Sequence, residues 1–208
     1  MTAIVSGRPG SRRVGLFGGA FDPPHLAHVA LARCAIQQLN LDVLHVLPTV
    51  QAWHRAAPTS PAPQRVEMAR LAFAGIAGLL VDPREARRSG PTYTADTLDG
   101  LRSEYPQAEF FLCIGADQAR NFEHWQRWAE IAVRATICVA QRDQFTPASG
   151  YFAPQVASRA QILGLDMPLM DVSSSSIRSR VQQGLGLAHL VAEPVARYIE
   201  HHQLYRTT

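Results

Sequence analysis

The chain has 208 residues, of which 47% are hydrophobic and 18% charged, and its formal net charge at pH 7 is +3. This length and composition are typical of one globular domain and exclude an intrinsically disordered chain. All 20 basic residues are arginine, and the absence of lysine excludes a Walker-type phosphate loop, a kinase lysine and a Schiff-base mechanism. Any phosphate is therefore expected to be bound by arginine, histidine, hydroxyls and backbone amides.

The remaining composition predicts a cytoplasmic protein with no membrane partner. No apolar run reaches the length of a membrane span, and the N-terminal segment lacks the apolar stretch of a signal peptide. The arginines are scattered, which argues against nucleic acid as a partner. The three cysteines have no CxxC spacing, so we expect buried reduced thiols and no metal site among them. We predict a flexible N-terminus over residues 1–12 and one domain over 13–208, and leave the oligomeric state open, a homo-oligomer included.

Strands and helices alternate in the first half of the sequence. The apolar patterns predict strands within residues 12–17, 41–48 and 78–85 and helices over 25–40 and 64–75. Residues 48–63 hold four prolines and no periodicity, which indicates a long functional loop.

The second half continues the alternation. A helix with a threonine cap is expected to stop before Pro106, and strands follow within residues 108–117 and 135–142. After a less regular stretch, residues 169–184 pass from extended chain to a helix that Gly184 ends, and residues 193–205 form the last helix. This order predicts a single α/β domain with a Rossmann-like, doubly wound parallel sheet and helices on both faces. The ligand site is expected beyond the carboxyl ends of the strands.

His25 and His28 lie in the segment "GLFGGAFDPPHLAHVA" (15–30), just after two prolines that begin a helix. A zinc site would need further ligands that the sequence does not fix in place. In the first turn of a helix the backbone N–H groups are unpaired and the dipole attracts anions. We therefore favour phosphate binding, with both rings donating hydrogen bonds and with Gly18 and Gly19 letting the backbone approach the ligand.

The segment "SSSSIR" (173–178) is the second phosphate candidate. One serine suffices to cap a helix, whereas four serines with Arg178 one turn later bring hydroxyls, amides and a guanidinium together.

The segments "GGAFDPPHLAH" and "VSSSSIR" resemble the GGxFDPxHxGH and ISSTxIR signatures of the nucleotidylyltransferase superfamily. The segments "PTYTADTL", "IGADQ", "HWQRW" and the C-terminal "LVAEPVARYIEHHQLY" are similar to the bacterial nicotinate-nucleotide adenylyltransferases within it. The likeness covers nearly the whole chain from Arg13 onward.

The resemblance implies transfer of AMP from ATP to nicotinate mononucleotide in NAD biosynthesis, with Mg²⁺ bound mainly through the ATP phosphates. It assigns His25, His28 and Arg178 to catalysis. ATP binding is assigned to Gly18, Gly19, Phe21, Ser174 and Ser175 together with those three residues. Mononucleotide binding is assigned to Thr94, Asp117, Trp125 and Arg55, with Trp125 stacking on the pyridine ring. No protein residue is expected to bind the metal directly.

Some positions depart from the family pattern. Ala27 replaces a glycine between the histidines, Ser175 replaces a threonine, and Arg55 stands where lysine is usual. None of these changes removes a catalytic group. Three alternatives remain: another adenylyl- or cytidylyltransferase, a non-catalytic nucleotide sensor, and a nucleic-acid module. Trp125 could also be a half-buried packing residue and Asp117 a helix cap.

Overall fold

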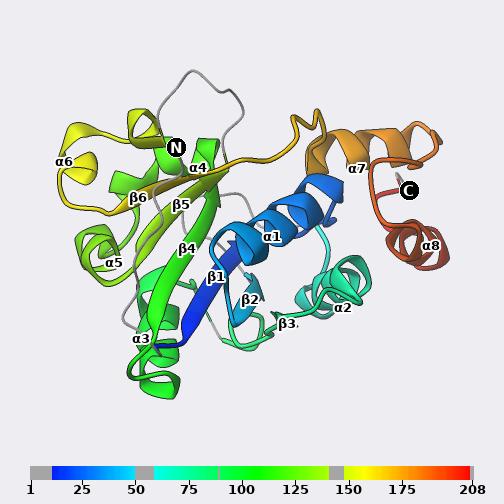
Figure 1. The fold of residues 1–208 in the computed structure, drawn as a ribbon. Coiled ribbons are helices and arrows are strands. Elements are labelled where there is room, and N and C mark those ends of the chain that lie inside the picture. Colours follow the sequence, from blue (N-terminus) through cyan, green and yellow to red (C-terminus); the bar gives the residue numbers. More distant parts are fainter. Residues whose placement is uncertain (1–10, 50–58, 89, 141–147, 207–208) are drawn as a thin grey trace.

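The computed structural model describes residues 11–49, 59–88, 90–140 and 148–206 (Figure 1). Six strands form one parallel sheet in the order β3-β2-β1-β4-β5-β6. The strands are β1 (Arg13–Gly19), β2 (Val43–Pro48), β3 (Leu79–Val81), β4 (Glu109–Gly115), β5 (Thr136–Ala140) and β6 (Ile162–Leu165). The chain begins at the centre of the sheet, moves to one edge and then to the other, which is the order of a doubly wound fold. The predicted fold class is confirmed.

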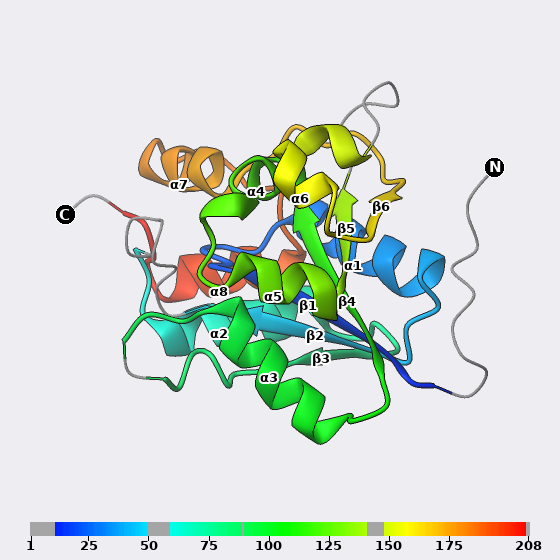
Figure 2. The ribbon, with the colours of Figure 1, turned by 90° about the vertical axis from the view of Figure 1, so that its left-hand side faces the viewer.

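Helices cover both faces of the sheet (Figures 1 and 2). One face carries α1 (Leu26–Gln38), α2 (Ala62–Phe73), α7 (Ser174–Gln182) and α8 (Glu193–His201). The other carries α3 (Thr94–Glu104), α4 (Ala116–Arg120), α5 (Trp128–Arg134) and α6 (Pro154–Ala157). Neighbouring residues of β1 enter different cores, Leu16 on the α3 side and Phe17 on the α1 side, because side chains alternate along a strand.

Two predicted helix ends are wrong. Tyr93, not a threonine, occupies the N-cap position of α3, and its backbone is extended (φ −119°, ψ 132°), so Thr94 is already the first helical residue. The last helix ends at His201, four residues earlier than predicted, and the chain then turns back through Gln203 and Tyr205, both with positive φ.

The sequence analysis did not find β6, which lies in the stretch taken as less regular. Its four residues pair with β5 at the sheet edge, from Ile137 opposite Ile162 to Ala140 opposite Leu165. Only Leu165 of the four is buried, so the strand has neither a continuous apolar run nor an alternating one.

Several predictions fall partly outside the described residues. Of the predicted flexible segment 1–12, only Ser11 and Arg12 are described, and both contact Glu109. Of the predicted loop 48–63, residues 50–58 lie outside the description and α2 already begins at Ala62. Cys113 and Cys138 are buried thiols, whereas Cys34 is half-buried. Within the described part of the chain, no helix has the length and apolar character needed to cross a membrane.

Candidate functional site

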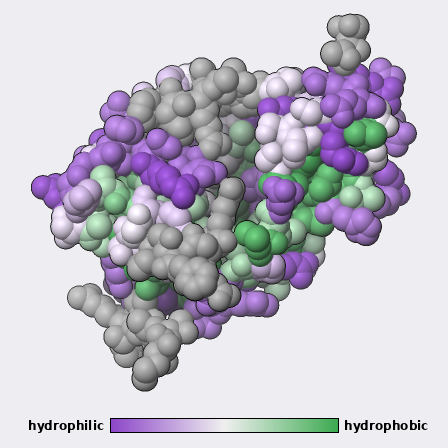
Figure 3. All heavy atoms as spheres, turned by 90° about the horizontal axis from the view of Figure 1, so that it is seen from above, coloured by the Kyte–Doolittle hydropathy of each residue, from purple (hydrophilic) through white to green (hydrophobic). Residues whose placement is uncertain are grey.

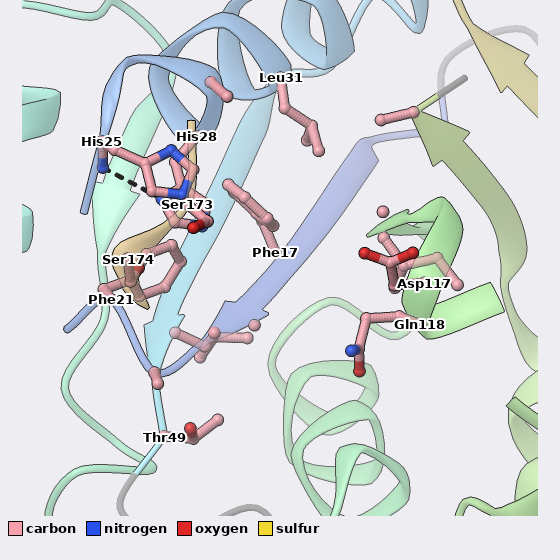
Figure 4. Close-up of a pocket in the computed structure, with 18 of the residues that line it drawn as sticks. Phe17, Phe21, His25, His28, Leu31, Thr49, Asp117, Gln118, Ser173 and Ser174 are labelled. Atoms are coloured by element: carbon pink, nitrogen blue, oxygen red, sulfur yellow. Dashed lines mark hydrogen bonds between the residues drawn. The ribbon is translucent and has the colours of Figure 1, made fainter. Parts of the chain in front are cut away.

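A pocket of about 580 Å³ opens at the carboxyl edge of the sheet. Its walls come from the turn after β1 and from the starts of α1, α3, α4 and α7. The segment that leads into α7 also contributes. In Figure 4, His25, His28, Ser173 and Ser174 lie at one end of the pocket, and Asp117 and Gln118 lie at the other. The view from above shows apolar residues exposed between hydrophilic margins (Figure 3). The sheet thus gathers the predicted segments at the edge where the sequence places the ligand.

His25 and His28 form a stacked pair at the start of α1. His25 is the N-cap residue and His28 lies in the first turn, as predicted, and their ring centroids are 3.6 Å apart. His28 also contacts the Phe21 ring edge-on, with a centroid distance of 5.1 Å. The two predicted phosphate-binding rings therefore lie side by side at one end of the pocket.

The backbone fixes which nitrogen of His28 can face a ligand. The backbone N–H of His25 donates to Nδ1 of His28 at 3.1 Å. A ring nitrogen that accepts a hydrogen bond carries no proton, so the proton of the neutral ring lies on Nε2. His28 in this arrangement therefore offers one donor, Nε2–H, to a ligand.

The pocket is lined by the predicted residues Gly18, Gly19 and Phe21. The space available for a side chain differs between the two glycines. A Cβ at Gly19 would lie 3.0 Å from the Phe21 ring, so a larger residue there would require the buried Phe21 side chain to shift. A Cβ at Gly18 would meet no atom within 4 Å and would extend into open space. Gly18 thus leaves room beside the backbone, which is what close approach by a ligand requires.

The start of α7 is bound directly to the turn after β1. The Ser174 hydroxyl donates to the carbonyl of Pro23 at 2.8 Å, and Arg178 Nη1 donates to the carbonyl of Asp22 at 2.8 Å. Ser173 caps the helix, accepting from the backbone N–H of Ser176. Ser175 is exposed at the pocket margin. The two signature segments, about 150 residues apart, therefore meet at one end of the pocket.

A buried polar cluster under this turn was missed by the sequence analysis. The Asp22 carboxylate accepts hydrogen bonds from the backbone N–H groups of Thr59 and Ser60 and from the Tyr205 hydroxyl, at 2.6, 3.2 and 2.7 Å. Arg65, 1% exposed, donates to the carbonyls of Ala20, Thr49 and Ser60. Burial lowers the pKa of Arg65, which the Asp22 charge opposes. Burial also raises the pKa of Tyr205, so its hydroxyl remains a donor.

The predicted mononucleotide residues lie at the opposite end. Thr94, Asp117 and Trp125 all line the pocket. Asp117 lies in the first turn of α4, where Gly115 is the N-cap residue, and its exposed carboxylate pairs with Arg120 at 3.1 Å. Trp125 is half-buried against Phe122 and still borders the cavity, so its packing does not remove it from the pocket.

Other positions in or near the predicted segments differ in where they lie. Trp128 is half-buried against the same core as Trp125 but does not line the pocket. Ala27 lines the pocket at the start of α1. Arg55 lies outside the described residues. Among the residues that the structure does describe, there is no group of three or more histidines, cysteines, aspartates or glutamates placed to hold a metal ion.

Glu85 is a second pocket residue that was not predicted from the sequence. The segment "VDPRE" (81–85) has no periodicity and no motif that would mark its glutamate as functional. It lines the pocket, is 4% exposed, and accepts a hydrogen bond from the Thr97 hydroxyl at 2.7 Å. Burial raises the pKa of Glu85 to about 6, against the hydrogen bond from Thr97, which lowers it.

Glu85→Gln is expected to remove a pH dependence of folding stability. The folded pKa of Glu85 is raised above its ordinary value of 4.5, so its protonated form stabilises the fold below pH 4.5, and this stability is lost as pH rises through about 6. Between pH 4 and pH 7 the wild type should lose about 2 kcal/mol of unfolding free energy relative to Glu85→Gln. Urea titrations of both proteins across this range measure the difference.

The same titrations distinguish the pH dependence of stability that comes from Glu85 from that of Asp82, the neighbouring buried acid. Hydrogen bonds from His45 and Arg84 outweigh burial and lower the pKa of Asp82 to about 2. Stability from Asp82 is therefore lost only as pH falls from about 4 toward 2, and both proteins share this loss. Parallel stability curves between pH 4 and pH 7 would contradict the role of Glu85.

Comparison with known proteins places the chain among nucleotidyltransferases. Residues 16–180 match the family described as cytidylyltransferase-like. A protein of Albidiferax ferrireducens named "probable nicotinate-nucleotide adenylyltransferase" is 49% identical over 196 residues, which cover 94% of this chain and 99% of that protein. A protein of Bordetella pertussis with the same name is 42% identical over 199 residues, which cover 95% and 100%.

A solved structure shares the fold. The nicotinic acid mononucleotide adenylyltransferase of Plasmodium falciparum, complexed with NaAD, superposes with a TM-score of 0.74 at 17% identity and covers 93% of this chain and 97% of its own. Three observations lead to one assignment: the contact between the two signature segments, the match to these relatives over nearly the whole chain, and the shared fold. The chain belongs to the cytidylyltransferase-like family and, within it, to the nicotinate-nucleotide adenylyltransferases.

Proposed function

We propose that this enzyme transfers the AMP group of ATP to nicotinate mononucleotide, giving deamido-NAD and pyrophosphate in NAD biosynthesis. The observation that carries the proposal is the pocket in which the two joined signature segments face Thr94, Asp117 and Trp125. The curated relatives carry the name of this activity, and the Plasmodium falciparum protein is described in complex with NaAD. Both substrates are metabolites of the cytoplasm, where we expect the protein to work.

The end of the pocket at the start of α1 suits the ATP phosphates. The helix has 13 residues, and the positive end of its dipole attracts anions. Nε2–H of His28 is a donor for an α-phosphate oxygen, and His25 lies beside it for the neighbouring phosphates. Arg178 and Ser175 at the start of α7 complete this end for the leaving pyrophosphate.

The opposite end suits the mononucleotide. Trp125 borders the cavity, and its large aromatic ring suits stacking on the pyridine ring. Thr94 and Asp117 offer a hydroxyl and a carboxylate to the mononucleotide, and the Asp117 carboxylate suits a ribose hydroxyl. We retain Arg55 as a mononucleotide-binding residue on the family resemblance alone.

The chemistry needs no covalent enzyme intermediate. An oxygen of the mononucleotide 5′-phosphate attacks the α-phosphorus of ATP in line, and the bond between that phosphorus and the oxygen bridging to the β-phosphate breaks. The nucleophile is already an anion, so no general base is required. The protein acts by positioning the two phosphates and by stabilising charge on the phosphoryl oxygens.

Mg²⁺ enters with ATP as part of the substrate, held mainly by the phosphates. Mg²⁺ prefers oxygen ligands and keeps several waters. The pocket fits such an ion, because it supplies serine and threonine hydroxyls and the Asp117 carboxylate and no nitrogen- or sulfur-rich cluster among the described residues.

A pyrophosphate-release assay with ATP and a panel of mononucleotides tests this function. Nicotinate mononucleotide is expected to give the highest kcat/KM, above nicotinamide mononucleotide and pantetheine phosphate, with deamido-NAD identified by mass spectrometry. Equal rates with the two pyridine nucleotides would contradict acid specificity. ATP binding without pyrophosphate release would favour a nucleotide sensor over an enzyme.

A further inference from the structure

Arg127 lies beside the mononucleotide end of the pocket, although it does not line the cavity. It directly follows Gln126, which does line it, and is the N-cap residue of α5. Its backbone is left-handed (φ 57°, ψ 32°), a conformation that a non-glycine residue adopts only when its surroundings hold it there. The chain therefore makes a sharp, fixed turn immediately after Trp125 and Gln126.

The Arg127 guanidinium joins three carboxylates from two helices. Nη1 donates to Asp96 and Nη2 to Asp99, both on α3 and both at 2.9 Å. Nε and Nη2 donate to the two carboxylate oxygens of Glu130, on α5, at 2.9 and 2.8 Å. Arg134, in the last turn of α5, shares Asp99 and Glu130 with it. The planar guanidinium group of Arg127 thus bridges α5 and α3.

Both ends of this connection lead into the pocket. On α3, Asp96 lies two residues after Thr94, which lines the cavity. On the other side, Arg127 lies two residues after Trp125, which also lines it. The contact between Arg127 and Asp96 therefore fixes how the segment with Thr94 faces the segment with Trp125.

The fold itself does not depend on these ion pairs. Arg127 and its three partners are 39–49% exposed, and exposed ion pairs add little to folding stability. The apolar core beneath, with Leu98 of α3 and Ile131 of α5 buried, holds the two helices together.

We propose that Arg127 is a positioning residue for the mononucleotide: through Asp96, Asp99 and Glu130 it sets the orientation of Trp125 toward Thr94. The inference rests on the proposed function and assigns this role to a residue outside the cavity. It follows that loss of Arg127 weakens mononucleotide binding and leaves ATP binding unchanged, because the phosphate end is built by α1 and α7. Lysine replaces it only in part, since one ammonium keeps the charge but does not reproduce a fork directed at three carboxylates.

The test compares Arg127→Ala, Arg127→Lys and Asp96→Asn with the wild type. Calorimetric titration with nicotinate mononucleotide alone is expected to give a Kd raised about tenfold for Arg127→Ala and less for Arg127→Lys and Asp96→Asn, with KM at saturating ATP rising in parallel. The Kd for ATP and kcat should stay within about twofold, and Tm within about 4 °C. The double variant Arg127→Ala/Asp96→Asn should lose less than the sum of the two single changes.

Arg134→Ala is the matched control, because it removes an arginine from the same group of charges at the far end of α5. Its Kd for the mononucleotide should stay within about twofold of the wild type. Unchanged mononucleotide affinity in Arg127→Ala, or an equal loss of affinity for both substrates, would overturn the inference. A wild-type protein that neither binds nor turns over nicotinate mononucleotide would instead overturn the proposed function.

Discussion

Replacing His28 by alanine is expected to lower kcat by about a hundredfold to a thousandfold while the protein stays folded. Under the proposed function Nε2–H of His28 donates to charge that develops on the α-phosphate, and removing one such preorganised donor has effects of this order. The side chain is half-buried at the surface of the pocket, so its loss leaves no core cavity. Pyrophosphate release measures kcat, and circular dichroism with thermal unfolding verifies the fold.

Two further variants separate the chemical role from the structural one. His28→Asn keeps a side-chain oxygen that can accept from the His25 backbone N–H, as Nδ1 does at 3.1 Å, but lacks the donor at Nε2. It should be as inactive as His28→Ala and more stable than it. His201→Ala, at an exposed position on α8, is the control and should keep normal turnover. Near-normal kcat in purified His28→Ala would remove this residue from the mechanism.

Replacing Arg65 by methionine is expected to give the largest loss of stability, about 3–5 kcal/mol in the free energy of unfolding. The guanidinium donates to three backbone carbonyls around the pocket and lies close to the buried Asp22 carboxylate. Methionine has a similar volume, so the loss measures unsatisfied polar groups and an unbalanced charge, not a cavity. Urea unfolding followed by tryptophan fluorescence gives the free energy.

Arg70→Met is the matched control on the same helix. Arg70 is 53% exposed and pairs with Glu67, three residues earlier, so its replacement should change the unfolding free energy by less than about 0.5 kcal/mol. Equally small changes in the unfolding free energy of both variants would contradict this prediction. They would show that the carbonyls around Arg65 find other hydrogen-bond donors. Under native conditions Arg65→Met should also raise KM for ATP, because Ala20 and Thr49 lie in the pocket wall.

The order of strands and helices could be read from the sequence because each element buries an apolar face with its own period. Five of the six strands were predicted in this way. The sixth, β6, was missed because its order comes from pairing with β5, and only Leu165 is buried. The threonine cap of α3 was wrong because Tyr93 takes the N-cap position and Thr94 is already helical.

The predicted site residues that the structure describes line one pocket, and their roles remain predictions. The motifs carry enough local information to place His25 and His28 at the start of a helix. They do not show that Ser174 and Arg178 donate to the carbonyls of Pro23 and Asp22, since those contacts join segments about 150 residues apart.

By itself, the sequence determined the fold class, the candidate phosphate-binding segments and the absence of lysine from any site, because periodicity, helix starts and composition are local properties. Only the tertiary structure decided which nitrogen of His28 is left as a donor, what balances the buried charges of Asp22 and Arg65, and how Arg127 joins α3 to α5. Those features depend on partners that are distant in sequence or on one hydrogen-bond direction. Tertiary packing determines these partners and this direction, and no local sequence pattern predicts them.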